Sequence, residues 1–75
     1  MTIDLFLKCQ AQIGLQGAIA ILNGNPKESD GYILFVVHGV VCCWGIDTDP
    51  VLLQNCDDDK EFQTFEDLIM ELLPH

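Results

Sequence analysis

The sequence contains no arginine and only three lysines, against twelve aspartates and glutamates, so its formal net charge at pH 7 is −9. Binding to DNA, RNA or anionic lipid depends on cationic side chains that contact phosphates. A protein with this charge repels phosphate groups instead. The composition therefore predicts no direct binding to nucleic acid and no binding to membranes.

Residues for nucleophilic catalysis are also scarce. A cysteine or serine nucleophile needs a histidine beside it, and the chain has only two histidines, His38 and His75, and one serine, Ser29. Nothing in the spacing selects a pair of carboxylates for acid–base chemistry. A chain of 75 residues also has little room for both a core and an enclosed pocket. We expect a protein that is not an enzyme and needs no cofactor.

No common metal site matches the spacing of the potential ligands. Cys42 and Cys43 are adjacent, so on a strand their side chains point to opposite faces. No CxxC or HxxxH pair is present to start a zinc site. A calcium loop beginning at Asp57 would need glycine at its sixth position and glutamate at its twelfth, where the chain has Phe62 and Leu68. We predict that the protein binds no metal.

No apolar stretch reaches the roughly 18–20 residues that a membrane helix requires. The longest, residues 32–46, is interrupted by His38, Gly39 and Gly45. The first residues do not resemble a signal peptide, because Asp4 lies where a cationic segment would be expected. The expected location is therefore the cytoplasm.

The chain has four cysteines, enough for two disulfides with three possible pairings. They lie inside apolar segments, and disulfides are rare in the cytoplasm. We expect reduced thiols that pack as small hydrophobic side chains. The residues are Cys9, Cys42, Cys43 and Cys56.

The charge that is present is distributed unevenly. Nine of the twelve acids lie between Asp47 and Glu71, where Lys60 is the single cation. The first 46 residues hold three acids and two lysines, so they carry a net charge of only −1. A one-sided field of this kind attracts cationic surfaces.

The length predicts one domain, residues 1–75. Hydrophobic residues make up 49% of the chain, which excludes general disorder despite the net charge. So high an apolar fraction in a small chain indicates that part of it is buried against a second copy or a partner. Self-association is therefore one expectation.

Secondary structure is harder to predict for the first half of the chain than for the second half. Residues 2–13 alternate like a strand, but a polar stripe at i, i+4 and i+8 and the composition favour a helix. Thr2 can cap this helix and Gly14 can end it. Residues 17–22 read as a short buried strand, and residues 23–31 as a polar loop.

Two valine-rich segments, residues 32–37 and 40–46, flank His38-Gly39 and predict a tight hairpin. In that hairpin Phe35 faces Cys42, and Ile33 faces Trp44. Neither strand alternates polar with apolar residues, so both faces are expected to be covered, one by helices and the other by a second molecule. Residues 51–55 are expected to return as a further strand.

The C-terminal segment has the strongest helical pattern, with Phe62, Phe65, Ile69 and Leu72 on one stripe. The helix is expected to begin near Asp59 or near Thr64 and to end by Leu73. Acids before a helix stabilise its N-terminus through capping and the helix dipole. The predicted core consists of Phe35, Trp44, Phe62, Phe65, Ile69 and Leu72.

These segments predict an α+β fold. A meander of three to four antiparallel strands in residues 17–55 is combined with an N-terminal helix, or less favourably a strand, and a C-terminal amphipathic helix.

The function that the charge favours is that of a small acidic interaction protein. It would act as an inhibitor that presents carboxylates to a basic, nucleic-acid-binding partner, as an anti-defence protein of a phage or mobile element does. The alternative is a small homodimeric α+β subunit with a scaffold or small-ligand-binding role, whose acids only make it soluble. The candidate partner-binding residues are Asp47, Asp49, Asp57, Asp58, Asp59, Glu66, Asp67 and Glu71.

Overall fold

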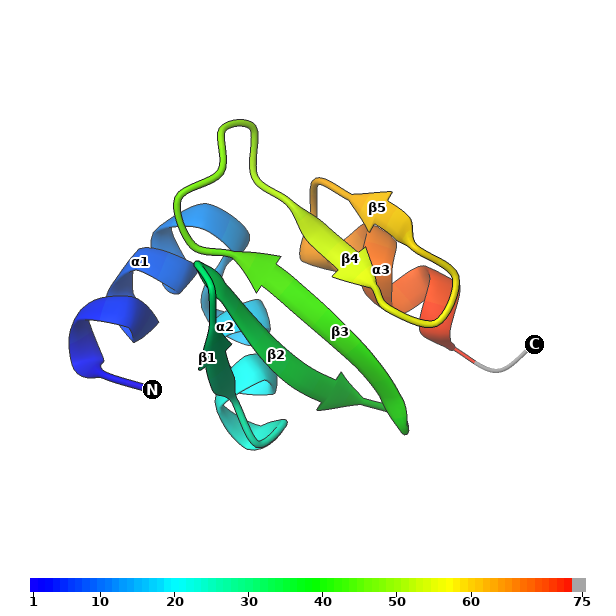
Figure 1. The fold of residues 1–75 in the computed structure, drawn as a ribbon, viewed down its shortest axis with the longest axis horizontal. Helices are drawn as coiled ribbons and strands as arrows, with labels where there is room; N and C mark the ends of the chain where they lie inside the picture. Colours follow the sequence, from blue (N-terminus) through cyan, green and yellow to red (C-terminus); the bar gives the residue numbers. More distant parts are fainter. Residues whose placement is uncertain (74–75) are drawn as a thin grey trace.

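The computed structural model describes residues 1–73, and it is an α+β protein with three helices and one five-stranded antiparallel sheet (Figure 1). The sheet is a meander in the order β1-β2-β3-β4-β5. The elements in chain order are α1 (Ile3–Ile13), α2 (Leu15–Asn23), β1 (Lys27–Ser29), β2 (Tyr32–Val37), β3 (Val40–Gly45), β4 (Leu53–Asn55), β5 (Lys60–Phe62) and α3 (Phe65–Leu72).

The N-terminal helix predicted for residues 2–13 is confirmed as α1. The Thr2 hydroxyl accepts a hydrogen bond from the Leu5 backbone N–H at 3.2 Å, so it caps a free donor of the first turn. Gly14 ends the helix with φ +89°, a conformation that side chains rarely adopt. Leu15 follows Gly14 directly and already begins the next helix, α2.

The strand predicted for residues 17–22 is wrong, because this segment forms most of α2. Its buried residues are Gly17, Ala18 and Ile21, which is the spacing of one helical face. The small residues let the helix lie close to its neighbours: a Cβ on Gly17 would come within 3.1 Å of the Phe65 ring. Gly24 ends α2 directly against β2, with the Val36 carbonyl oxygen 2.6 Å from where a Cβ would be.

The hairpin predicted around His38-Gly39 is confirmed, including its register. Phe35 pairs with Cys42, and Ile33 pairs with Trp44. The meander is longer than predicted and lies further along the chain, since it includes β1 and β5 but not residues 17–22. These two edge strands have three residues each and a mostly polar sequence, so they carry almost no alternating pattern.

Two of the sheet's connections are two-residue turns with positive φ at both positions. Asp30 and Gly31 join β1 to β2 with φ of 48° and 85°, and His38 and Gly39 join β2 to β3 with φ of 51° and 77°. This geometry matches the twist of the strands and favours Asn-Gly, Asp-Gly or Gly-Gly.

His38 is therefore an unfavourable residue for its position. Replacing it with asparagine is expected to raise the free energy of unfolding by about 0.5 kcal/mol, because asparagine adopts the left-handed conformation at lower cost. His38→Val is the opposite control, since a β-branched side chain resists this conformation. Chemical denaturation of the three proteins tests the order, and a His38→Asn protein less stable than the native one would contradict it.

The C-terminal helix α3 begins at the later of the two predicted positions. The Thr64 hydroxyl accepts the Asp67 backbone N–H at 3.1 Å and caps the helix. Residues 57–59 do not precede the helix directly but form the turn between β4 and β5. In this turn the Asp58 carboxylate accepts the Lys60 backbone N–H at 3.0 Å, and Asp59 has φ +57°.

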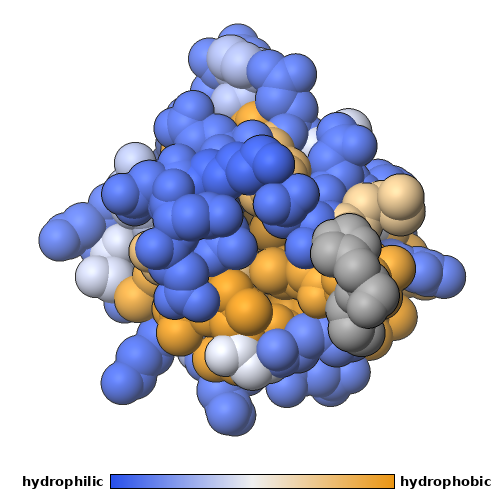
Figure 2. Space-filling model, turned by 90° about the vertical axis from the view of Figure 1, so that its right-hand side faces the viewer, coloured by the Kyte–Doolittle hydropathy of each residue, from blue (hydrophilic) through white to orange (hydrophobic). Residues whose placement is uncertain are grey.

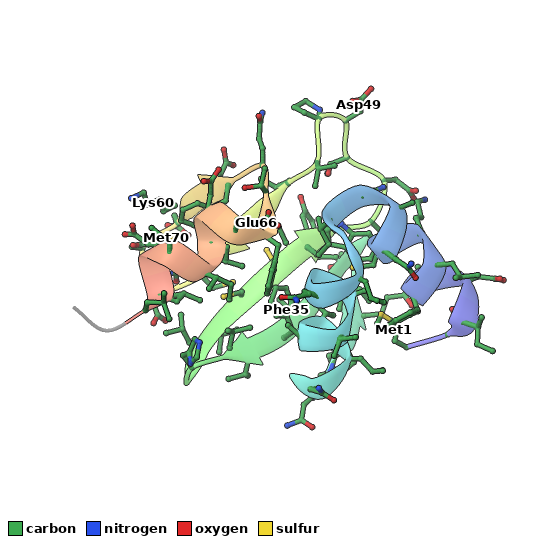
Figure 3. All side chains as sticks on the ribbon, turned by 180° about the vertical axis from the view of Figure 1, so that it is seen from behind. Met1, Phe35, Asp49, Lys60, Glu66 and Met70 are labelled. Carbon is green, nitrogen blue, oxygen red and sulfur yellow. The ribbon has the colours of Figure 1, made fainter. Side chains whose placement is uncertain are left out.

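All three helices lie on one side of the sheet (Figure 1, Figure 3). The row Ile33, Trp44 and Leu53 points toward them from neighbouring strands and is fully buried. The Trp44 indole N–H donates to the Gln12 side-chain oxygen at 2.9 Å, which joins the sheet to α1. The predicted core is largely confirmed: Phe35, Trp44 and Phe65 are buried, and the partly buried Phe62, Ile69 and Leu72 pack against them.

Candidate interaction surface

The eight acids predicted to bind a partner occupy three places in the fold, and all eight are exposed. Two lie in the loop between β3 and β4, three lie in the turn between β4 and β5, and three lie on α3. In that order they are Asp47 and Asp49; Asp57, Asp58 and Asp59; and Glu66, Asp67 and Glu71.

Figure 2 looks onto the end of the molecule formed by β5 and α3. A broad hydrophilic surface covers the upper part of this view, and apolar side chains gather below it. In Figure 3, Asp49 lies at the tip of its loop, while Glu66 and Lys60 lie at the α3 end. The acids of the β4–β5 turn and of α3 thus lie at one end of the molecule, whereas Asp47, in the loop between β3 and β4, lies beside Lys8 of α1.

Two of the candidate carboxylates are neutralised by lysines within residues 1–73. Lys8 on α1 pairs with Asp47, and Lys60 on β5 pairs with Glu71 at 3.1 Å. Lys60 also lies 5.8 Å from the centre of the Phe62 ring. Each pair joins two parts of the chain that are distant in sequence, but both pairs are exposed, so each contributes little to stability.

The remaining candidates form no ion pair among the residues that the structure describes. Exposed carboxylates that lack a cation nearby project their field into solvent, where it acts over about 8–10 Å at moderate salt. Asp58 is one of these unpaired carboxylates, and it also accepts the hydrogen bond from the Lys60 backbone N–H in the turn. The acids without a cationic neighbour are Asp49, Asp57, Asp58, Asp59, Glu66 and Asp67.

Glu61 belongs to the same acidic end, although it is not among the residues predicted from sequence to bind a partner. It lies on β5, pairs with Gln54, and is exposed on the side of the sheet away from the helices. The short strand from Lys60 to Phe62 alternates in facing the helices and facing solvent. That alternation is the signal that would have found Glu61, but three residues are too few to reveal it.

The outer face of the sheet is not covered by any helix of residues 1–73 (Figure 1). The expectation that helices cover one face is thus met, and none of the three helices described covers the other face. Tyr32, Val36 and Val41 are each about two-fifths exposed on this face. They form an apolar strip on the same face as Glu61.

The surface of the described residues has several hollows that are open to solvent. One, of about 490 Å³, lies between the β3–β4 loop and β5, with Pro50 and Glu61 on its walls. Within residues 1–73, no three histidine, cysteine or carboxylate side chains lie close enough together to hold a metal ion. His38 lies in its turn, and His75 lies outside the described residues.

The four cysteines are free thiols, three of them buried and Cys56 exposed. Burial raises the pKa of Cys9 to about 12. Burial also raises the pKa of Cys42 and Cys43 to about 11, and the neighbouring Cys56 adds to the effect at both. A thiol must ionise to act as a nucleophile, so these three remain protonated and unreactive near neutral pH.

No family model matches the chain, and comparison with curated proteins and with solved structures finds no significant match. No helix of residues 1–73 is long and apolar enough to cross a membrane.

Proposed function

We propose that this protein is a small acidic interaction protein that binds a basic partner, with the carboxylates around β5 and α3 facing that partner. The supporting observation is that, within residues 1–73, all of these exposed acids except Glu71 lack an ion-pair partner. Lys60, the only lysine in the chain's second half, is already engaged with Glu71.

The proposed partner is a protein whose natural ligand is nucleic acid. Such a protein has a cationic groove spaced for phosphates, and a cluster of carboxylates can occupy the same groove. Bound in this way, the acidic protein acts as a competitive inhibitor, as an anti-defence protein of a phage or mobile element would.

Charge alone does not give tight binding, because most affinity comes from apolar contacts at the centre of an interface. The uncovered sheet face supplies such a centre, since Tyr32, Val36 and Val41 are exposed there, on the same face of the sheet as Glu61. In this proposal the carboxylates speed association and orient the partner, and the apolar strip slows dissociation.

The proposal is tested by capturing the partner from the source cell, purifying it and comparing two matched variants. One changes Asp57, Asp58 and Asp59 to asparagine; the other neutralises three acids of the first half by Asp4→Asn, Glu28→Gln and Asp30→Asn. Both reduce the net charge from −9 to −6. Asparagine keeps the side-chain oxygen that Asp58 uses in its turn, and it tolerates the positive φ of Asp59.

The variant of residues 57–59 is expected to bind the partner about tenfold or more weakly than the native protein. The variant of the first-half acids is expected to show a much smaller loss of affinity. Native binding is expected to weaken as salt rises from about 50 to 500 mM, because the screening length falls from roughly 14 to 4 Å. Duplex DNA is expected to compete with the protein for its partner. Equal effects of the two variants, or salt-independent binding, would contradict the proposal.

A further inference from the structure

Most of the exposed large hydrophobic residues of the described chain lie on or beside the first two helices. Among residues 1–73, eleven large hydrophobic residues are substantially exposed, and six of them fall within the first 22 residues. Ile3, at 78%, is the most exposed of all. The six are Met1, Ile3, Leu7, Leu15, Ile19 and Leu22.

On α2 these residues form a regular stripe. Leu15, Ile19 and Leu22 fall at i, i+4 and i+7, so they share one face of the helix. A neighbouring face, with Ala18 and Ile21, is buried against the core. The sequence of α2 thus has two apolar faces, of which the described structure covers only one.

The stripe continues onto α1. Ile3 and Leu7 are one helical turn apart, and a small apolar hollow lined by Ile3, Phe6 and Leu22 connects the two helices. Figure 3 views the molecule from the side on which α1 and α2 lie. We call the exposed residues Ile3, Leu7, Leu15, Ile19 and Leu22 the helical face.

The charge around the helical face differs from that of the rest of the protein. Residues 1–26 contain only two charged side chains, Asp4 and Lys8, which have opposite signs. Figure 1 shows α1 at one end of the molecule and β5 and α3 at the other. The helical face itself carries no charged side chain and lies away from the acids of the β4–β5 turn, although Leu15 shares a surface hollow with Glu66 of α3.

We propose that the helical face is a self-association interface, at which a second copy of this chain packs. A second copy also carries −9, so its acidic end would be repelled by the acidic end of the first. A neutral apolar face has no such repulsion and is complementary to itself. Two-fold packing brings the same stripe from each copy into contact.

The size of the molecule is compatible with this interface. A stable dimer buries about 800 Å² on each partner, and the whole chain exposes 4718 Å². The interface would thus need about one-sixth of the accessible surface. A face formed by two adjacent helices can supply an area of that size. Homodimer interfaces are also more apolar than the remaining surface. Such a dimer leaves both acidic ends free to bind basic partners.

The test measures the mass of the native protein by sedimentation equilibrium over a range of concentrations, with Ile19→Glu and Val36→Glu as a matched pair. Ile19 on the helical face and Val36 on the sheet face are both 42% exposed, so the two substitutions place equal charge on equally exposed apolar sites. The native protein is expected to approach twice its monomer mass of 8.4 kDa. Ile19→Glu is expected to raise the dimer dissociation constant at least about tenfold, and Val36→Glu to leave it nearly unchanged.

A second variant distinguishes loss of the dimer interface from loss of folding. Leu15→Glu adds its charge at the first turn of α2, where the helix dipole favours an acid, and should dissociate the dimer while circular dichroism stays native.

Added salt should leave the dimer unchanged or strengthen it, because it screens the repulsion between two acidic copies. A protein that remains monomeric at high concentration would overturn the proposal. So would a dimer disrupted by Val36→Glu but not by Ile19→Glu, which would place the interface on the sheet. Binding of a basic partner weakens with salt instead, so the two proposals fail separately.

Discussion

Replacing Leu68 with aspartate is expected to unfold the protein. Leu68 lies on α3, has no exposed surface and belongs to the central core. An aspartate there would bury a carboxylate that has no cation beside it, or would have to bind a proton at a considerable cost. A cost above about 4 kcal/mol is comparable to the total stability of roughly 5–10 kcal/mol expected for a small domain.

Met70 provides the matched control on the same helix. It is 68% exposed, so Met70→Asp places the same charge in solvent two residues away and should change stability by less than about 0.5 kcal/mol. Circular dichroism and thermal unfolding distinguish the two variants. If Leu68→Asp folded as well as Met70→Asp, then α3 would not pack against the sheet as the structure shows.

Replacing Trp44 with alanine is expected to cause the second large loss of stability. Trp44 is fully buried, and removing its ring would cost about 3–5 kcal/mol through lost apolar burial and the cavity left behind. The substitution also removes the hydrogen bond from the indole N–H to Gln12. Urea denaturation is expected to show a much lower midpoint concentration with a transition that stays cooperative. If the native free energy of unfolding is no larger than this cost, the variant will be unfolded without urea.

Gln12→Leu separates the hydrogen bond from the packing. This variant leaves the indole N–H of Trp44 without its partner, which should cost about 1–3 kcal/mol, clearly less than removal of the ring. If Trp44→Ala proved milder than Gln12→Leu, the indole would not be the centre of the core.

The elements that could be predicted from sequence are those specified by local patterns. The β2–β3 hairpin was found with its register because two valine-rich segments flank a two-residue turn that ends in Gly39. Helix α1 was found from the polar stripe and the cap at Thr2, and α3 from its apolar stripe and Thr64. In each case the signal lies within a few residues of the element it defines.

Helix α2 was mistaken for a strand because its residues are apolar on two faces. A short apolar segment has the same appearance whether it is a buried strand or a helix with a second exposed stripe. Its true structure depends on Ala18 and Ile21 packing against the sheet, with Gly17 beside Phe65, contacts that join residues distant in sequence. The exposed stripe of Leu15, Ile19 and Leu22 is the part of this pattern that the core does not explain.

The candidate acids were identified from sequence, but their surroundings were not. The structure assigns Asp58 to a β-turn rather than to a helix start, and pairs Asp47 and Glu71 with lysines. It also adds Glu61, whose strand is too short to have been predicted. Acids were expected on the surface because charged side chains are costly to bury.

The sequence by itself determined the net charge of −9, the concentration of acids after Asp47, the central hairpin and the two capped helices. These features depend on composition or on short-range patterns. Only the tertiary structure decided which sheet face the helices cover, which carboxylates have a lysine beside them, and which apolar stripe stays exposed. Those outcomes depend on contacts between distant residues, such as Gln12 with Trp44 and Lys60 with Glu71, which no local pattern specifies.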